Sequence, residues 1–365
     1  TVTLATSATS IAENAGSSLT LTATLSNATY QDVTVALGTS GAATEGTDYT
    51  DGSGNIDDIT ISAGSTTATV SFTPTDDSFY DATSNETATI SVTGVSGGSA
   101  SESGTQAVTI TITDNESAPT VTLSTASTSI DENSTDTITL TATLTNATYQ
   151  DVTVSIDGTG GTGTEGTDFG TVSDITISAG SATGTVTFDP TDDSVYEGNE
   201  TAGISVSGVS GGGASESGSQ SVTITITENE SAPTVTLTTS ATSIAENAGS
   251  SLTLTATLSV ATTADVTVTI GTAGTATEGT DYTDGSGNID DITISAGSTT
   301  GTVNFTPTDD SIYDAASNET AIISIDGVSG GSASEDGTQS VTITITDNES
   351  APAVTLTVSA TSIAE

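Results

Sequence analysis

The stretch Leu19-Thr-Leu-Thr-Ala23 alternates an apolar residue with threonine, and Val108-Thr-Ile-Thr-Ile112 does the same. Alternation with period two is typical of a β-strand that buries one face and exposes the other to water. Threonine suits the exposed face because its β-branch favours an extended backbone. No segment shows a helical period. The pattern therefore predicts an all-β fold, although only 3% of the residues are aromatic and 38 are glycine.

Turn signals divide the first hundred-odd residues into short strands. Asn14-Ala-Gly16, Asp51-Gly-Ser-Gly54 and Ser96-Gly-Gly98 are such signals. About seven short strands in a segment of this length predict an antiparallel β-sandwich of the immunoglobulin-like kind. The expected strands are Val2–Ile11, Ser17–Leu25, Asp32–Leu37, Ile56–Ser62, Thr66–Thr73, Glu86–Val95 and Gln106–Thr113.

The chain repeats itself. The block that opens with Val2-Thr-Leu recurs at Val121, Val235 and Val354. Each full block has the size of a single domain. We therefore expect tandem seven-stranded sandwiches in an elongated array, with the junction Ser117-Ala-Pro119 and its equivalents stiffened by proline. The expected domains are residues 1–119, 120–233 and 234–352, followed by 353–365 as the first strand of a fourth repeat, within a longer array.

Charge restricts the chemistry of the chain. It has no Lys, Arg or His against 47 Asp and Glu, so its formal net charge is −47. Two like charges 4 Å apart repel by roughly 4 kcal/mol at an effective dielectric constant near 20. Clustered carboxylates must therefore separate, take up protons or bind metal ions.

The missing residue types also exclude function classes. Without His, Lys or Cys there is no Ser-His triad, Ser-Lys dyad or thiolate nucleophile, and no disulfide. A carboxylate pair remains chemically possible, but every acidic cluster recurs in all three repeats, so we expect no enzyme. The negative charge disfavours nucleic acid and anionic lipid. The sequence contains no run of 18 apolar residues, so it predicts no membrane-spanning helix.

The acidic residues lie between the predicted strands and form four ordered motifs. In repeat one these are Glu13-Asn-Ala-Gly16, Glu45-Gly-Thr-Asp-Tyr49, Asp76-Asp-Ser-Phe-Tyr-Asp81 and Ile112-Thr-Asp-Asn-Glu116. All four recur, with small changes, in repeats two and three. In this order they resemble the Calx-β domain, which occurs in sodium–calcium exchangers, in an integrin tail and in large bacterial surface proteins.

The resemblance implies a sandwich that holds Ca²⁺ in the loops at one end. Carried over by position, the implied ligands are carboxylates and one backbone carbonyl for each repeat. In repeat one they are Glu13, Asp48, Asp76, Asp77, Phe79, Asp81, Asp114 and Glu116. In repeat two they are Glu132, Asp168, Asp192, Asp193, Val195, Glu197, Glu228 and Glu230. In repeat three they are Glu246, Asp281, Asp309, Asp310, Ile312, Asp314, Asp347 and Glu349, and Glu365 would begin a further site.

Two departures from the family pattern affect these expectations. The middle acid of the closing motif is replaced by Asn115, Asn229 or Asn348, which removes one charge and lowers the expected ion count or affinity. An insertion before Glu86 and Glu319, absent from repeat two, leaves those two residues outside the expected ligand set. The residue chemistry still favours Ca²⁺, which takes six to eight oxygen ligands, whereas transition metals prefer His or Cys.

The expected function is structural. Tandem Ca²⁺-binding sandwiches predict a calcium-rigidified extracellular rod, such as an adhesin stalk or surface filament. Its partners would be calcium ions, neighbouring repeats and other copies of the chain. The alternatives are a calcium sensor, a calcium-dependent adhesive or sugar-binding module, and an accessory region of a secreted enzyme. Tyr30 and Tyr149 mark a possible contact between neighbours, although repeat three has Thr263 there.

Overall fold

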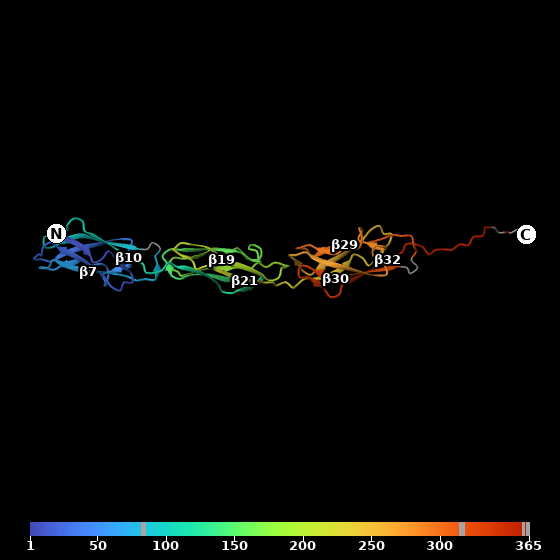
Figure 1. Ribbon diagram of the computed structural model, residues 1–365, viewed down its shortest axis with the longest axis horizontal. Coiled ribbons are helices and arrows are strands. Elements are labelled where there is room, and N and C mark those ends of the chain that lie inside the picture. Colours follow the sequence, from blue (N-terminus) through green and yellow to red (C-terminus); the bar gives the residue numbers. More distant parts are fainter. Residues whose placement is uncertain (82–84, 314–317, 360–361, 363–365) are drawn as a thin grey trace. The chain divides into compact units, whose positions relative to one another are not determined.

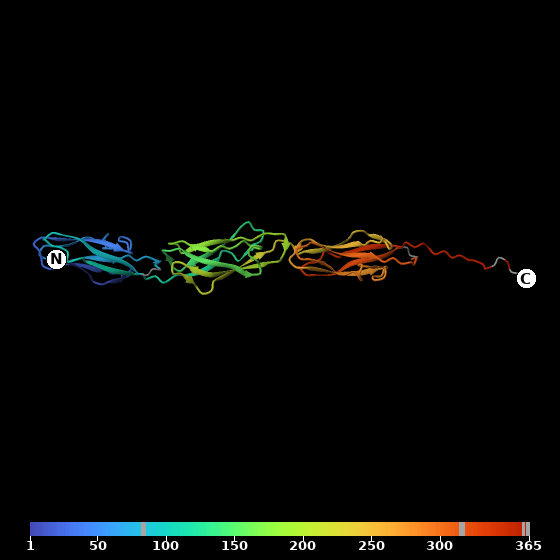
Figure 2. The ribbon, with the colours of Figure 1, turned by 90° about the horizontal axis from the view of Figure 1, so that it is seen from above.

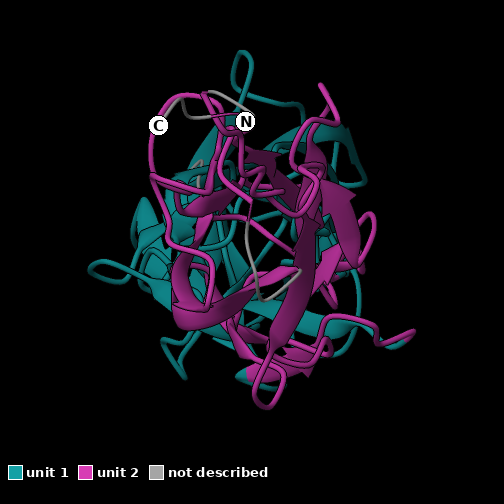
Figure 3. Cartoon of the chain, turned by 90° about the vertical axis from the view of Figure 1, so that its right-hand side faces the viewer, with its two compact units in different colours: residues 1–128, 136–189, 202–224 teal, residues 129–135, 190–201, 225–365 magenta. Residues whose placement is uncertain are grey.

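The computed structural model describes residues 1–81, 85–313, 318–359 and 362, and within them every regular element is a β-strand. None of these residues belongs to a helix that is long and apolar enough to cross a membrane. The chain divides into two compact units (Figure 3). Unit 1 comprises residues 1–128, 136–189 and 202–224; unit 2 comprises 129–135, 190–201 and 225–365. The division passes through repeat two, so each unit is described by itself.

The strands follow the three repeats (Figure 1). Repeat one contains β1 (Val2–Thr6), β2 (Ser10–Ala12), β3 (Leu19–Leu25), β4 (Val33–Gly41), β5 (Tyr49–Thr50), β6 (Ile59–Ile61), β7 (Thr67–Pro74), β8 (Phe79–Tyr80), β9 (Glu86–Ser96) and β10 (Ala107–Thr113). Repeat two contains β11 (Thr120–Thr125), β12 (Ser129–Asp131), β13 (Ile138–Leu144), β14 (Ala147–Thr148), β15 (Val152–Gly161), β16 (Ile175–Ile177), β17 (Thr183–Phe188), β18 (Val195–Tyr196), β19 (Glu200–Ser210), β20 (Ser215–Glu216) and β21 (Ser221–Thr227). Repeat three contains β22 (Thr234–Thr239), β23 (Ser243–Ala245), β24 (Leu252–Leu258), β25 (Ala261–Thr262), β26 (Val266–Gly274), β27 (Tyr282–Thr283), β28 (Ile292–Ile294), β29 (Thr300–Pro307), β30 (Glu319–Ser329), β31 (Ser334–Glu335) and β32 (Ser340–Thr346).

Repeat one is a sandwich of two sheets. One sheet has the order β1-β3-β7-β5 and the other β2-β10-β9-β4-β6. Along β3 the apolar residues Leu21, Ala23 and Leu25 are buried, while the threonines between them are partly exposed. Phe72 stacks on Tyr49 with ring centroids 4.6 Å apart, and both side chains belong to this core. The alternation of apolar residues with threonine therefore builds the sandwich as the sequence predicts.

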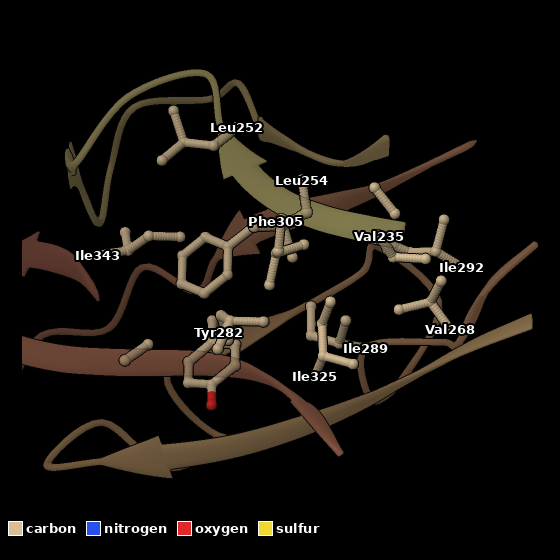
Figure 4. Close-up of a cluster of buried hydrophobic side chains, with 14 of the residues drawn as sticks. Val235, Leu252, Leu254, Val268, Tyr282, Ile289, Ile292, Phe305, Ile325 and Ile343 are labelled. Carbon is tan, nitrogen blue, oxygen red and sulfur yellow. The ribbon is translucent and has the colours of Figure 1, made fainter. Parts of the chain in front are cut away.

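Repeat three has the same architecture within unit 2. Its sheets run β27-β29-β24-β22-β31 and β23-β32-β30-β26-β28. Phe305 and Tyr282 again stack, with centroids 4.7 Å apart, among buried Leu254 and Val268 (Figure 4). In repeat two, the sheet β17-β13-β11-β20 lies within unit 1, and β12 pairs with the end of β21 within unit 2. The view from above shows the strands of each repeat again (Figure 2).

Several details of repeat one differ from the predicted strands. The expected strand Val2–Ile11 is interrupted after Thr6, so that β1 joins one sheet and β2 the other. β2 runs parallel to β10, and the sandwich is therefore mostly rather than wholly antiparallel. β5 and β8 were not predicted, because a strand of two residues shows no periodicity. β4 is longer than predicted and continues to Gly41. The strand needs glycine at this position, because a Cβ atom would lie 2.0 Å from the Thr87 carbonyl oxygen.

The strand expected after Val354 is not formed. Residues 351–359 have no strand, and the side chains of Val354 and Leu356 are 97% and 94% exposed. The equivalent strand of repeat one, β1, is buried because it pairs with β3, Val2 opposite Leu25. In the described residues, no strand pairs with this segment, and its apolar side chains stay exposed.

Candidate metal centre

Strand register gathers carboxylates at one end of repeat one. β2 and β10 are parallel neighbours that stop together, with Thr113 opposite Ala12. Glu13 and Asp114 are the next residues along the two strands. β9 is antiparallel to β10 and begins at the same edge with Glu86. Three acidic side chains that are distant in sequence therefore meet at one sheet edge.

The second sheet contributes acids at the same end. β5 pairs with the end of β7, Tyr49 opposite Pro74. The carbonyl oxygen of Asp48 accepts a hydrogen bond of 2.9 Å from the Thr75 backbone N–H. This bond holds the Asp48 loop against the segment that carries Asp77.

Both groups line one cavity of about 30 Å³. One carboxylate oxygen from each of Glu13, Asp114 and Glu116 lies within 4.8 Å of the other two. Because the chain has no basic side chain, no protein cation can compensate this charge. The cavity is lined by Glu13, Asp48, Thr75, Asp77, Phe79, Asp81, Asn85, Glu86, Ile112, Asp114 and Tyr149.

Backbone N–H groups hold the carboxylates in place. Asp114 accepts hydrogen bonds of 2.8 Å from the backbones of Asp81 and Glu116, and Glu13 accepts one of 3.3 Å from Asn115. The Oε2 atom of Glu116 is buried without a hydrogen-bond partner. An unpartnered buried carboxylate oxygen is costly. This oxygen is therefore suited to contact a cation.

The acidic neighbourhood also shifts proton affinity. Burial, followed by the hydrogen bond with Glu116, raises the pKa of Glu13 to about 8. Burial and the nearby charge of Asp48 raise the pKa of Glu86 to about 7. Raised carboxyl pKa values mean that the ionised cluster is unfavourable without a cation.

Repeat three forms the same cluster within unit 2. Oxygens of Glu246, Asp310 and Glu349 lie within 4.8 Å of one another, and Glu246 is 9% exposed. Glu349 Oε2 is buried without a hydrogen-bond partner, as at the equivalent atom in repeat one. The hydrogen bond with Glu246, together with burial, raises the pKa of Glu349 to about 7. A cavity beside the cluster is lined by Glu246, Asp281, Thr308, Asp310, Glu319, Ile345 and Asp347.

Repeat two brings Glu132, Asp192 and Glu230 together within unit 2. One carboxylate oxygen of each lies within 4.8 Å of the other two. Glu132 is 8% exposed, and burial together with the charge of Glu228 raises its pKa to about 8. Glu228 itself accepts backbone hydrogen bonds of 2.7 Å from Glu197 and Gly198. The buried early glutamate is therefore a common feature of repeats two and three.

The remaining predicted ligands have different surroundings. Asp76 and Asp309 lie outside the described linings of the two cavities, whereas their neighbours Asp77 and Asp310, although also exposed, line them. Asp168 accepts a hydrogen bond from Thr164 within unit 1. Asp193 accepts one from the Val195 backbone N–H; Ile312 donates its N–H to Asp310, and its side chain is 67% exposed. Asp314 and Glu365 lie outside the described residues.

Two acids left out of the expected set line the cavities. Glu86 and Glu319 are the first residues of β9 and β30, so the strands deliver them to the sandwich end regardless of the preceding insertion. The usable sequence signal was the apolar alternation that starts directly after each glutamate.

The acidic end of repeat one also meets the next repeat within unit 1. β8 and β14 form a short parallel ladder, Ala147 opposite Phe79. The Tyr149 hydroxyl donates a hydrogen bond of 2.5 Å to Asp77 Oδ2, and its ring lies against Phe79 with centroids 5.1 Å apart. The bond to Asp77 and burial raise the pKa of the Tyr149 hydroxyl above its ordinary range. β18 and β25 form the equivalent ladder within unit 2, Val195 opposite Ala261.

Comparison with known proteins identifies these repeats. The sequence profile of the Calx-beta domain matches residues 1–116, 114–230 and 228–349. None of the curated proteins matches the sequence.

The chain is also similar to solved structures, at low sequence identity. CBD12 from CALX1.2 is 16% identical, with 62% of this chain and 99% of that chain covered, at a TM-score of 0.29. The calcium binding domain CBD12 of CALX1.1 is 14% identical, with 60% and 96% covered, at 0.27. Invasin, a bacterial integrin-binding protein, is 15% identical, with 95% and 60% covered, at 0.32.

Proposed function

The chain belongs to the Calx-beta domain family, and from this premise we propose that each repeat binds Ca²⁺ at its acidic end. The observation that carries the proposal is the convergence of carboxylates from separate loops in a chain without a single basic side chain. The ligand set proposed for each repeat is the one expected from the sequence, with Glu86 and Glu319 added from the cavity linings.

The donor set fits this ion. Ca²⁺ binds carboxylate and carbonyl oxygens in flexible geometry, and carboxylates are the most frequent polar groups in both cavity linings. The buried, unpartnered oxygens of Glu116 and Glu349 are atoms for which a cation would replace the missing partner. Extracellular calcium modules have Kd values of about 10⁻⁴–10⁻³ M. We propose binding in that range, at the calcium concentration outside cells.

The role that follows is structural. Ca²⁺ at Asp114 and Glu116 would neutralise the sandwich end directly before the junction to the next repeat, whose sequence begins at Thr120. Repeats at residues 1–119, 120–233 and 234–352 would then form a calcium-rigidified extracellular rod, such as an adhesin stalk or filament. Neighbouring repeats and other copies of the chain would be its protein partners.

Isothermal titration calorimetry on the full chain tests the binding. We expect Ca²⁺ to bind with more than one ion per chain, and Mg²⁺ more weakly because it retains its waters. Glu13→Gln, Glu132→Gln and Glu246→Gln should each remove sites from one repeat only. Asp57→Asn removes one exposed charge outside the clusters and should leave the stoichiometry unchanged. Absence of Ca²⁺ binding at millimolar concentration would overturn the proposal.

A further inference from the structure

The two junctions between repeats differ at three matched positions. Both have the same short parallel ladder, β8 with β14 and β18 with β25. The side chains around the ladders differ in size and chemistry. The first junction has Phe79, Tyr149 and Gly213, where the second has Val195, Thr263 and Ser332.

The three residues of the first junction fit one another within unit 1. The Tyr149 ring lies against Phe79 at a centroid distance of 5.1 Å and an interplanar angle of 36°. Gly213 has φ +64°, and a Cβ atom there would lie 2.7 Å from Cε1 of Tyr80. Repeat two therefore accepts the β8 aromatic side chains closely, and a serine at position 213 would crowd Tyr80.

Tyr149 reaches the acidic cavity of repeat one from the neighbouring repeat. Its hydroxyl donates to Asp77 Oδ2 at 2.5 Å, and its side chain lines the cavity. Oδ1 of Asp77 accepts the Phe79 backbone N–H at 2.6 Å. A carboxylate offers about four lone-pair sites, so both hydrogen bonds leave Asp77 able to contact a cation. Both bonds also fix the orientation of the carboxylate.

We propose that Tyr149 is a positioning residue for the metal site of repeat one, and that it couples cation binding there to docking of repeat two. The inference rests on the proposed calcium function. Partners that orient a ligand typically change metal affinity by about 10–100-fold. Because coupling between two equilibria is reciprocal, the bound cation then strengthens the Tyr149 contact by the same factor. Thr263 has no ring and cannot make this contact, so the second junction lacks the coupling.

Spin-label distance measurements on the full chain test this coupling. The chain has no cysteine, so the exposed strand residues Thr69, Thr185 and Thr302 can be replaced by cysteine in pairs and labelled specifically. The Thr69/Thr185 pair reports the first junction and the Thr185/Thr302 pair reports the second. Distance distributions are recorded against Ca²⁺ concentration, beside calorimetric Ca²⁺ titration of the same proteins.

When only the labelling cysteines are present, we expect Ca²⁺ to narrow the distribution of spin-label distances across the first junction more than across the second. Tyr149→Thr, which copies the second junction, should raise the Ca²⁺ concentration for half-maximal narrowing about 10-fold. Tyr149→Phe should shift it in the same direction, because the hydroxyl carries the bond to Asp77. Tyr30→Thr alters the equivalent, fully exposed tyrosine of repeat one and should change nothing.

The outcomes separate this inference from the function on which it rests. If calorimetry shows no Ca²⁺ binding, the proposed function fails. If Ca²⁺ binds but the first junction does not narrow, or if Tyr149→Thr leaves the midpoint unchanged or lowers it, the coupling is overturned. If Tyr149→Phe behaves like the wild type, ring packing rather than the hydrogen bond holds the junction, and the positioning role is rejected.

Discussion

The body of each sandwich and its acidic end are built from opposite chemistry. In the body of repeat one, Leu21, Phe72 and Ile110 are fully buried, and threonine covers the outer faces. At the end of the same sandwich, Glu13 and Asp114 lie side by side without a compensating cation. The body satisfies its own packing and backbone hydrogen bonds, whereas the proposed function makes the end depend on a cation from solution.

This contrast separates two contributions to stability. Apolar burial contributes about 25 cal/mol per Å² and does not depend on calcium. The end contributes unfavourably while its carboxylates are ionised and unbound, and under the proposed function it would contribute favourably once a cation is bound. Perturbations of the body and of the end should therefore respond differently to calcium.

Removing calcium should have the largest effect. Ligand binding to the folded state stabilises it by RT ln(1 + [L]/Kd), which is about 2.7 kcal/mol per site at one hundred times Kd. With sites in three repeats, we expect EDTA to lower the unfolding free energy by several kcal/mol and to leave like charges facing one another. Differential scanning calorimetry with and without EDTA measures the change in Tm.

Phe72→Ala is the matched perturbation of the body. Deleting a buried phenylalanine side chain costs about 3–5 kcal/mol, and Phe72 stacks on buried Tyr49. Its cost in repeat one should be similar in calcium and in EDTA, because the core contains no ligand. A Tm of the wild-type chain that is unchanged by EDTA would contradict the calcium dependence of the end.

The body could be predicted from sequence, whereas the end could be predicted only in part. The buried positions in β3 and β10 follow directly from the alternation with threonine, because residue periodicity determines which side chains face inward. The break after Thr6 was missed, although the alternation stops there: Val2 and Leu4 are buried at even positions, and the next buried apolar residue is Ile11, at an odd one. This change of phase coincides with the change of sheet, and it was overlooked because the segment was treated as one strand.

At the acidic end, the sequence predicted which segments meet but not which carboxylate of each segment faces the cluster. Asp77 lines the cavity of repeat one and Asp76 does not, yet in repeat two it is Asp192, the first acid of the pair, that joins the cluster. Side-chain direction in an irregular loop depends on backbone torsions that spacing does not determine. The sequence marked Tyr149 as a contact between neighbours, but it could not name Asp77 as the partner, because that pairing depends on how the two repeats pack.

The pH dependence of Tm should reverse its sign when calcium is bound. The change should be smaller than that caused by chelation, because the carboxyl groups are partly solvated. In the calcium-free chain, the pKa values of Glu13 and Glu132 are raised from 4.5 to about 8. The folded state therefore keeps protons that the unfolded state releases. The stabilisation that these retained protons give the folded state is present in full below pH 4.5, and it is lost as the pH rises towards 8.

We therefore expect Tm in EDTA to fall between pH 5 and pH 8.5. With saturating calcium it should rise over the same range, because the metal binds the deprotonated carboxylates. The double variant Glu13→Gln/Glu132→Gln should flatten the EDTA profile. Parallel profiles in EDTA and in calcium would show that these carboxylates do not titrate as a metal-linked cluster.

The smallest expected effect concerns the asparagine inside the closing motif. Asn115 donates its side-chain N–H to Glu116 Oε1 at 2.8 Å, so it relieves some of the charge that the cluster accumulates. Asn115→Asp replaces that donor by another carboxylate. Without calcium, we expect the added repulsion to lower stability by about 0.5–1 kcal/mol, as for other partly exposed like-charge pairs. With calcium, the added ligand charge should tighten binding in repeat one, so the same substitution should raise Tm.

Asn27→Asp is the control, because it adds the same charge at an exposed turn outside the cluster. It should change Tm little in either condition. The diagnostic result is a reversal of sign that only Asn115→Asp shows, since general charge effects act alike on both variants. If Asn115→Asp destabilises the chain equally in EDTA and in calcium, Asn115 lies outside the reach of the ion. The asparagine would then act in the loop as a hydrogen-bond donor to Glu116, and the closing motif would contribute only Asp114 and Glu116 to the site.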